Sequence, residues 1–157
     1  SALGFKQAEA VAEQLASQPV NQILASPMRR CQETSRPFAG QSGLQVSTEP
    51  AVTEIPTPDG LDDRVDWLRG FMAGTWDAAP PVVADWREAL VGKLASIENH
   101  TVVFTHFIAI NTIVGHLSGS DAVTSFRPGH CSVTKLQREN DVLRIVERGS
   151  EAATRVL

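Results

Sequence analysis

Two short apolar segments that each lead directly into a helical pattern constrain the fold of this chain most. They are 22–25 (Gln-Ile-Leu-Ala) and 101–105 (Thr-Val-Val-Phe-Thr). Short apolar or β-branched runs of this kind are typical of strands buried on both faces. Strands that alternate with helices along a chain predict an α/β fold. We therefore expect a three-layer sandwich with a mostly parallel central sheet and helices on both faces.

Hydrophobic spacing and the positions of proline and glycine predict the remaining elements. The expected helices are 1–17, 28–39, 61–73, 82–97 and 107–117. Pro37 should bend or end the second of these helices. The other expected strands are 44–48, 131–138 and 142–147, with a short extended piece at 51–54.

Length, charge and cysteine content narrow the class of protein. The chain has 157 residues, which is enough for one domain with a real core, and we expect a single domain over 1–157. Its net charge of −4 argues against nucleic acid as a partner. Cys31 and Cys131 do not make a disulfide framework, so a reducing, cytoplasmic location is expected. The apolar stretch 102–114 is too short and too polar to cross a membrane.

The junction after the first apolar segment carries positive charge in an unusual place. Ser26 is a good N-cap and Pro27 a good first helical residue, which puts Arg29 and Arg30 in the first turn of a helix. Cations normally favour the other end of a helix, because the N-terminus already carries a partial positive charge. The arrangement is favourable if an anion binds there.

Residues suited to phosphate chemistry follow the ends of several predicted strands. In open α/β sheets, ligands bind beyond the carboxyl ends of the strands. Arg29 and Arg30 follow one strand, His106 follows another, and Glu54 ends the extended piece. Arginine binds phosphate bidentately, and histidine and a carboxylate can exchange protons with it.

Each of these residues also has a purely structural interpretation. The arginines could be solvated, Glu54 could be a turn carboxylate before Pro56, and His106 could be a hydrogen-bonded core histidine. No pair of histidines has metal-ligand spacing, so no metal site is expected.

Three segments resemble one known family. The segment Ser-Pro-Met-Arg-Arg-Cys-Gln-Glu-Thr at 26–34 looks like the second conserved block of the histidine phosphatase superfamily, the phosphoglycerate-mutase-like proteins. Segment 102–107 resembles that family's late strand, which ends in its second catalytic histidine, and segment 1–8 is similar to its first helix. The order and spacing of the three fit over nearly the whole chain.

The resemblance implies a phosphomonoester hydrolase that acts on a small phosphorylated substrate through a phosphohistidine intermediate, without a cofactor. Arg30 would hold the transferring phosphoryl group, and Arg29 would be its neighbour or a substrate contact. His106 would donate a hydrogen bond to a phosphoryl oxygen, and Glu54 would be the general acid and base.

The chain departs from the family pattern in three places. The Arg-His-Gly triplet that carries the family's nucleophile is absent, and its expected position is upstream of Ser1, in a first strand that this chain lacks. Phe107 stands where many relatives have glycine. After Glu54 the chain lacks the Arg-x-Tyr/Trp-Gly of true mutases, which favours a phosphatase over a phosphoglycerate-type mutase. A catalytically inactive phosphate-binding or interaction module of the same fold is the other alternative.

Three further residues have open interpretations. His130 lies in a loop that comes near the active-site mouth in this family, where a substrate contact competes with simple solvation. Phe71 and Trp76 are packing residues or part of an apolar lid over the pocket. Neither the substrate nor the oligomeric state follows from the sequence.

Overall fold

A three-stranded parallel sheet organises the chain. The computed structural model describes residues 1–152. Strand β1 (Gln22–Ala25) lies at the centre of the sheet, between β2 (Val46–Thr48) and β3 (Thr101–Phe104), so that the order is β2-β1-β3. Both pairings are parallel, and Ala25 is level with Thr48 on one side and with Phe104 on the other. The carboxyl ends of all three strands therefore lie at one edge.

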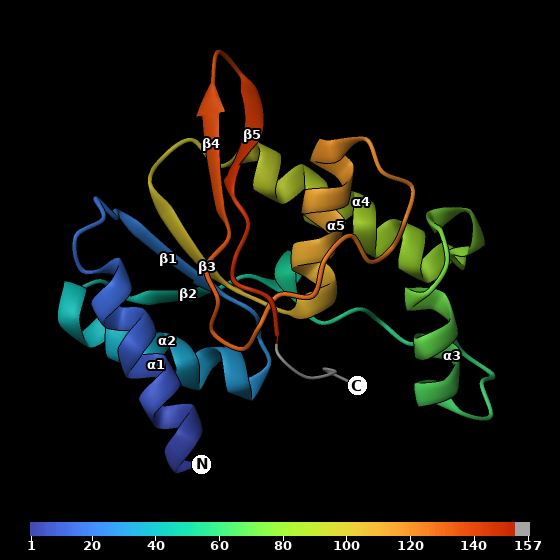
Figure 1. The fold of residues 1–157 in the computed structure, drawn as a ribbon, viewed down its shortest axis with the longest axis horizontal. Helices are drawn as coiled ribbons and strands as arrows, with labels where there is room; N and C mark the ends of the chain where they lie inside the picture. Colours follow the sequence, from blue (N-terminus) through green and yellow to red (C-terminus); the bar gives the residue numbers. More distant parts are fainter. Residues whose placement is uncertain (153–157) are drawn as a thin grey trace.

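Helices connect the strands, as the alternating pattern predicts (Figure 1). Helix α1 precedes β1, α2 joins β1 to β2, α3 and α4 lie between β2 and β3, and α5 follows β3. The bounds are α1 Ala2–Leu15, α2 Arg29–Ser42, α3 Arg64–Met72, α4 Pro81–Ser96 and α5 Phe107–Ser118, with short 3-10 turns η1 at Pro50–Val52 and η2 at Trp76–Ala78.

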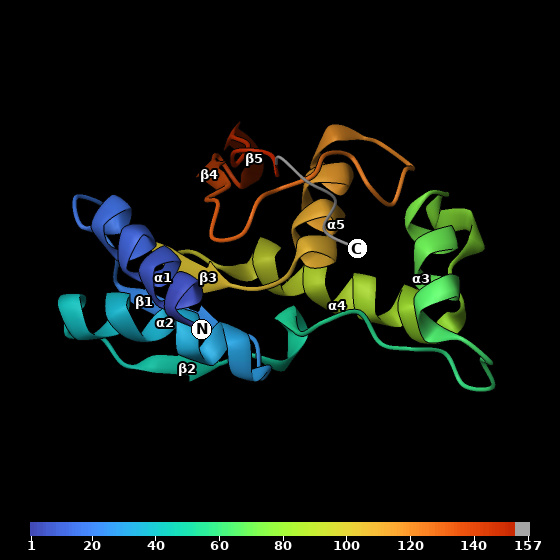
Figure 2. The same cartoon turned by 60° about the horizontal axis from the view of Figure 1, so that its bottom comes forward.

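The side chains of β3 show that the sheet is covered on both faces. Val102 and Phe104 pack into a cluster with residues of α1 and α2. Val103, which points the opposite way because side chains alternate along a strand, packs into a second cluster with residues of α3, α4 and α5. The expected three-layer α/β architecture with helices on both faces is confirmed (Figures 1 and 2).

A separate antiparallel hairpin lies on the β3 side of the sheet in both views (Figures 1 and 2). Its strands are β4 (Lys135–Glu139) and β5 (Val142–Glu147). Apolar side chains of the hairpin pack against α5, and Arg138 donates a hydrogen bond to the carbonyl of Ile97 at 3.1 Å. Within residues 1–152, β3 pairs only with β1, and no strand occupies its other edge.

The second helix is longer than the sequence pattern predicts. It passes through Pro37 and ends at Ser42, beyond the expected end at residue 39. A proline removes one helical hydrogen bond, but Phe38 is only 3% exposed and anchors this part of the helix in the core. The helix stops at Gly43, whose φ of +74° is the left-handed conformation typical of a helix end.

Local turns shift other boundaries. The piece 51–54, expected to be extended, begins as the 3-10 turn η1, because the Glu49 carboxylate accepts the backbone N–H of Ala51 at 2.9 Å. Helix α3 begins at Arg64, since Asp63 caps it by accepting the N–H of Asp66 at 3.1 Å.

Two strand starts also come later than expected. Strand β4 starts at Lys135, since Cys131 has a φ of +57° and the N–H of Ser132 closes a turn onto the Gly129 carbonyl at 3.1 Å. Strand β2 starts at Val46 rather than at residue 44.

Within 1–152, no helix is both long and apolar enough to span a lipid bilayer.

Asn111 on α5 fixes the loop that follows this helix. Its side chain is fully buried, and its Oδ1 accepts the backbone N–H groups of Ser125 at 2.6 Å and Phe126 at 3.1 Å. These two donors have few other ways to satisfy their hydrogen-bonding capacity inside the protein. Asn111 therefore takes the place of a backbone pairing partner for this loop.

We expect Asn111→Ala to lower the free energy of unfolding by about 2–4 kcal/mol, because it leaves two buried donors without their acceptor. Urea denaturation monitored by circular dichroism would measure the change. Asn99→Ala, at an exposed asparagine, is the control and should change stability by less than about 0.5 kcal/mol. Equal effects of the two substitutions would contradict the assigned role.

Candidate active site

The structure brings Arg30, Glu54 and His106 together. The Nη2 atom of Arg30 lies 2.5 Å from Oε2 of Glu54 and 3.2 Å from Nδ1 of His106. The same Glu54 oxygen is 3.5 Å from the His106 Nδ1. A guanidinium, a carboxylate and an imidazole from three distant segments thus converge at the carboxyl ends of β1 and β3.

Arg30 is placed by the helix that follows β1, but that helix does not begin as expected. Helix α2 begins at Arg29 with Met28 as its N-cap residue, so the expectation that Ser26 is the N-cap and Pro27 the first helical residue is wrong. The reason is that Ser26 stays buried at the end of β1, where its hydroxyl lies 2.8 Å from Nε2 of His106. The tertiary contact draws Ser26 out of the helical register.

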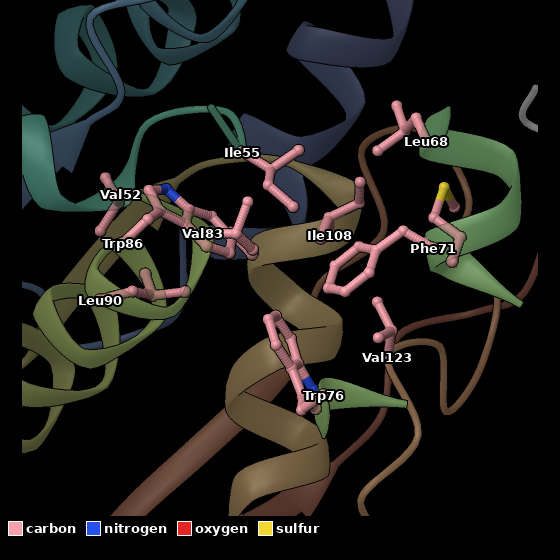
Figure 3. Close-up of a cluster of buried hydrophobic side chains, with 12 residues drawn as sticks. Val52, Ile55, Leu68, Phe71, Trp76, Val83, Trp86, Leu90, Ile108 and Val123 are labelled. Atoms are coloured by element: carbon pink, nitrogen blue, oxygen red, sulfur yellow. The ribbon is translucent and has the colours of Figure 1, made fainter. Parts of the chain in front are cut away.

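Glu54 is held by hydrogen bonds to the backbone just before it. The Thr105 hydroxyl donates to the Val52 carbonyl at 2.6 Å, and the Trp86 indole N–H donates to the Thr53 carbonyl at 3.2 Å. Val52, Trp86 and Ile55, the residue that follows Glu54, belong to one buried hydrophobic cluster (Figure 3). Glu54 is therefore carried by an ordered, core-anchored segment instead of a free loop.

His106 sits where β3 leads into α5 and is only 4% exposed. Burial lowers the pKa of His106 below its usual 6.5; the neighbouring Glu54 opposes this shift, and Arg30 adds to it. The imidazole is therefore neutral at pH 7 while no anion is bound.

Two helices begin beside these side chains. Helix α2 starts at Arg29 directly after β1, and α5 starts at Phe107 directly after β3. The first N–H groups of a helix have no partner inside it and carry partial positive charge, which favours an anion. Together with Arg30 they make the site suitable for a phosphate group.

Arg29 does not join this group. Its Nε donates to the Glu33 carboxylate at 2.8 Å, and its side chain is 91% exposed. The hydrogen bond to Glu33, one helical turn on, raises the pKa of Arg29 further and offsets part of the repulsion from the helix start. The two arginines are thus separated in role: only Arg30 reaches the cluster.

Ser26 and Cys31 contact His106, and sequence reasoning missed both contacts. The Cys31 Sγ is 3.6 Å from the His106 Nε2 and donates to the Thr105 carbonyl at 3.4 Å. Burial raises the pKa of Cys31 to about 11, so its thiol stays protonated. The one available signal was that Ser26 directly follows one predicted strand and His106 directly follows another, since the carboxyl ends of parallel strands share one edge.

The three residues with open interpretations are His130, Phe71 and Trp76. His130 is exposed, and in the described part of the chain it makes no hydrogen bond or ion pair with Arg30, Glu54 or His106. Phe71 and Trp76 are each 6% exposed, with their rings packed edge to face at 5.4 Å (Figure 3). Both aromatic residues belong to the core beneath α3.

Comparisons with known proteins found similar sequences. A family model described as "Histidine phosphatase superfamily (branch 1)" matches residues 1–64. The uncharacterized protein Rv0525 of Mycobacterium tuberculosis is 31% identical over 170 residues, which cover 98% of this chain and 84% of that protein.

Solved structures share the fold. Bacillus stearothermophilus YhfR has a TM-score of 0.78 at 19% identity, covering 94% of this chain and 83% of its own. Mycobacterial glucosyl-3-phosphoglycerate phosphatase Rv2419c, in complex with inorganic phosphate, has a TM-score of 0.74 at 22% identity, covering 96% of this chain and 87% of its own.

The lowered pKa of His106 gives a pH-dependent contribution to stability. The contribution is fully present above pH 6.5 and is lost as the pH falls through the lower pKa of the folded state, because the unfolded chain then binds a proton that the folded chain does not. Between pH 7 and about pH 5, we therefore expect the free energy of unfolding to fall less in His106→Gln than in the wild type. Urea denaturation at several pH values would measure it.

His100→Gln is the matched control, since His100 is exposed and lies at the opposite end of β3. This variant should keep the wild-type dependence on pH. An unchanged slope in His106→Gln would show that the buried imidazole does not contribute.

Proposed function

Because this chain belongs to the histidine phosphatase superfamily, we propose that it is a phosphomonoesterase that acts through a phosphohistidine intermediate. The observation that carries this proposal is the convergence of Arg30, Glu54 and His106 within 3.5 Å of one another at the carboxyl ends of β1 and β3. The substrate would be a small phosphorylated molecule. A phosphatase among the structures of the same fold supports hydrolysis over transfer within a mutase.

Arg30 would bind the phosphoryl group. The Arg30 side chain is 69% exposed. Its guanidinium can therefore turn from Glu54 to incoming phosphoryl oxygens without a rearrangement of the core. Phosphoryl transfer depends mainly on positioning and charge compensation, which a guanidinium and two helix N-termini supply. His106 would donate a hydrogen bond to one of the same oxygens.

Glu54 would act as the general acid in the first step and as the general base in the second. When substrate binds and Arg30 turns to the phosphoryl group, Glu54 takes up a proton from solvent. In the first step a nucleophilic histidine forms an N–P bond, the ester P–O bond breaks, and the protonated Glu54 carboxyl gives its proton to the leaving oxygen. In the second step Glu54 takes a proton from water as the water oxygen attacks phosphorus and the N–P bond breaks. Alcohol and inorganic phosphate are released, and both histidine and Glu54 return to their starting states.

The nucleophile would come from a strand that precedes Ser1 in the gene product and completes a single domain with residues 1–157. The free edge of β3 supports this placement, since Val102 and Val103 are only half-buried there, whereas Ile23 and Leu24 of the fully paired β1 are buried. A parallel strand at that edge would end beside His106, because the carboxyl ends of parallel strands meet at one side of a sheet.

The intact gene product should hydrolyse an aryl phosphate such as p-nitrophenyl phosphate with chelator present and no added metal. Arg30→Ala and His106→Ala should each lower kcat about a hundredfold or more, because each removes a group that stabilises charge in the transition state. Steady-state kinetics, with circular dichroism to confirm folding, would measure these effects.

Arg29→Ala is the matched control, since Arg29 adjoins Arg30 on the same helix but, among residues 1–152, pairs with Glu33 instead of Glu54. It should change kcat by less than about threefold, as expected for an exposed ion pair. Equal losses in the two arginine variants would contradict the assignment of Arg30. Phosphate binding without turnover by the intact protein would favour an inactive phosphate-binding module.

A further inference from the structure

The contacts of His106 determine which ring nitrogen carries the proton. The Arg30 guanidinium can only donate hydrogen bonds, and its Nη2 lies 3.2 Å from the His106 Nδ1. The lone pair of Nδ1 therefore faces Arg30. The Glu54 oxygen is 3.5 Å from Nδ1, too far to compete for a proton on that atom. A neutral ring in this setting carries its proton on Nε2.

The proton on Nε2 meets the hydroxyl of Ser26. The two atoms are 2.8 Å apart, and Ser26 is fully buried. The same hydroxyl oxygen accepts the backbone N–H of Met28 at 3.2 Å, so both acceptor positions of Ser26 are used. The Ser26 hydroxyl oxygen thus has an acceptor role toward both the imidazole and the backbone.

Ser26 is itself held in place from three sides. Its backbone N–H donates to the Phe104 carbonyl at 2.9 Å, which ties the end of β1 to the end of β3. Its carbonyl accepts a hydrogen bond from the Gln32 side chain at 2.8 Å. With the bond from Met28, these contacts leave the hydroxyl little freedom to move away from the imidazole.

We propose that Ser26 is a positioning residue that holds His106 in the tautomer with the proton on Nε2 and turns the bare Nδ1 toward Arg30 and Glu54. Nδ1 is then the atom that takes up a proton and donates it as a hydrogen bond when a phosphoryl group binds. This last step rests on the proposed phosphatase function. The tautomer and the orientation of the ring do not depend on that function.

The test is ¹⁵N NMR of the intact gene product, labelled at histidine and recorded without phosphate at pH 8. Wild-type His106 should show an unprotonated Nδ1 and a protonated Nε2. In Ser26→Ala the preference should weaken, because Nε2 loses its acceptor, and signal from the other tautomer or an averaged shift should appear. If the protein is a phosphatase, kcat should also fall about tenfold or more while KM changes less.

Ser35→Ala is the matched control. Ser35 is also a fully buried serine on the same segment of chain, but its hydroxyl donates to the Gln32 carbonyl at 2.7 Å and does not touch His106. This variant should keep the wild-type tautomer and kcat.

A proton on Nδ1 in the wild-type spectrum would overturn the proposal even if Ser26→Ala fails to fold. An unchanged tautomer in a folded Ser26→Ala variant would do the same. Failure of the phosphatase hypothesis is separable, since an inactive protein with the expected tautomer would support the positioning role and remove only its use in phosphoryl transfer.

Discussion

The parallel pairing of β1 with β3 is the constraint on which the candidate site depends. Ala25 lies level with Phe104, and the N–H of Ser26 extends the ladder by one more bond to the Phe104 carbonyl. Whatever follows the two strands is therefore placed side by side. Ser26 and Arg30 follow β1, and His106 follows β3, so residues about 80 positions apart meet within hydrogen-bond distance.

The charged groups of the site neutralise one another while no anion is bound. Arg30 pairs with Glu54 across a largely exposed gap, and such a pair contributes little to stability because water screens it. Its importance is positional: it keeps a guanidinium near a neutral, buried imidazole, where a phosphate could replace the carboxylate as its partner. Burial of His106, which keeps the ring uncharged, prevents a second positive charge from opposing Arg30.

Two hydrophobic clusters support the site from opposite faces of the sheet. Cys31 and Phe104 belong to the cluster with α1 and α2, while Ile55 and Ile108 belong to the cluster with α3 and α4. Each of these residues is within two positions of Arg30, His106 or Glu54. The polar side chains thus sit on well-packed backbone, which limits how far they can shift.

The sequence by itself determined the type and order of the elements and the three residues that meet, because hydrophobic spacing is a local property and the carboxyl ends of parallel strands share one edge. It did not predict that α2 continues past Pro37 as far as Ser42, since the packing of Phe38 compensates for the missing hydrogen bond. Helical spacing alone does not separate Arg29 from Arg30; the family resemblance favoured Arg30, and the structure shows that Glu33 pairs with Arg29 while Glu54 pairs with Arg30. Ser26 shows the limit most clearly. Local preference makes it a helix cap, and only the pairing of two strands, which places it 2.8 Å from a histidine 80 residues away, decides that it serves His106 instead.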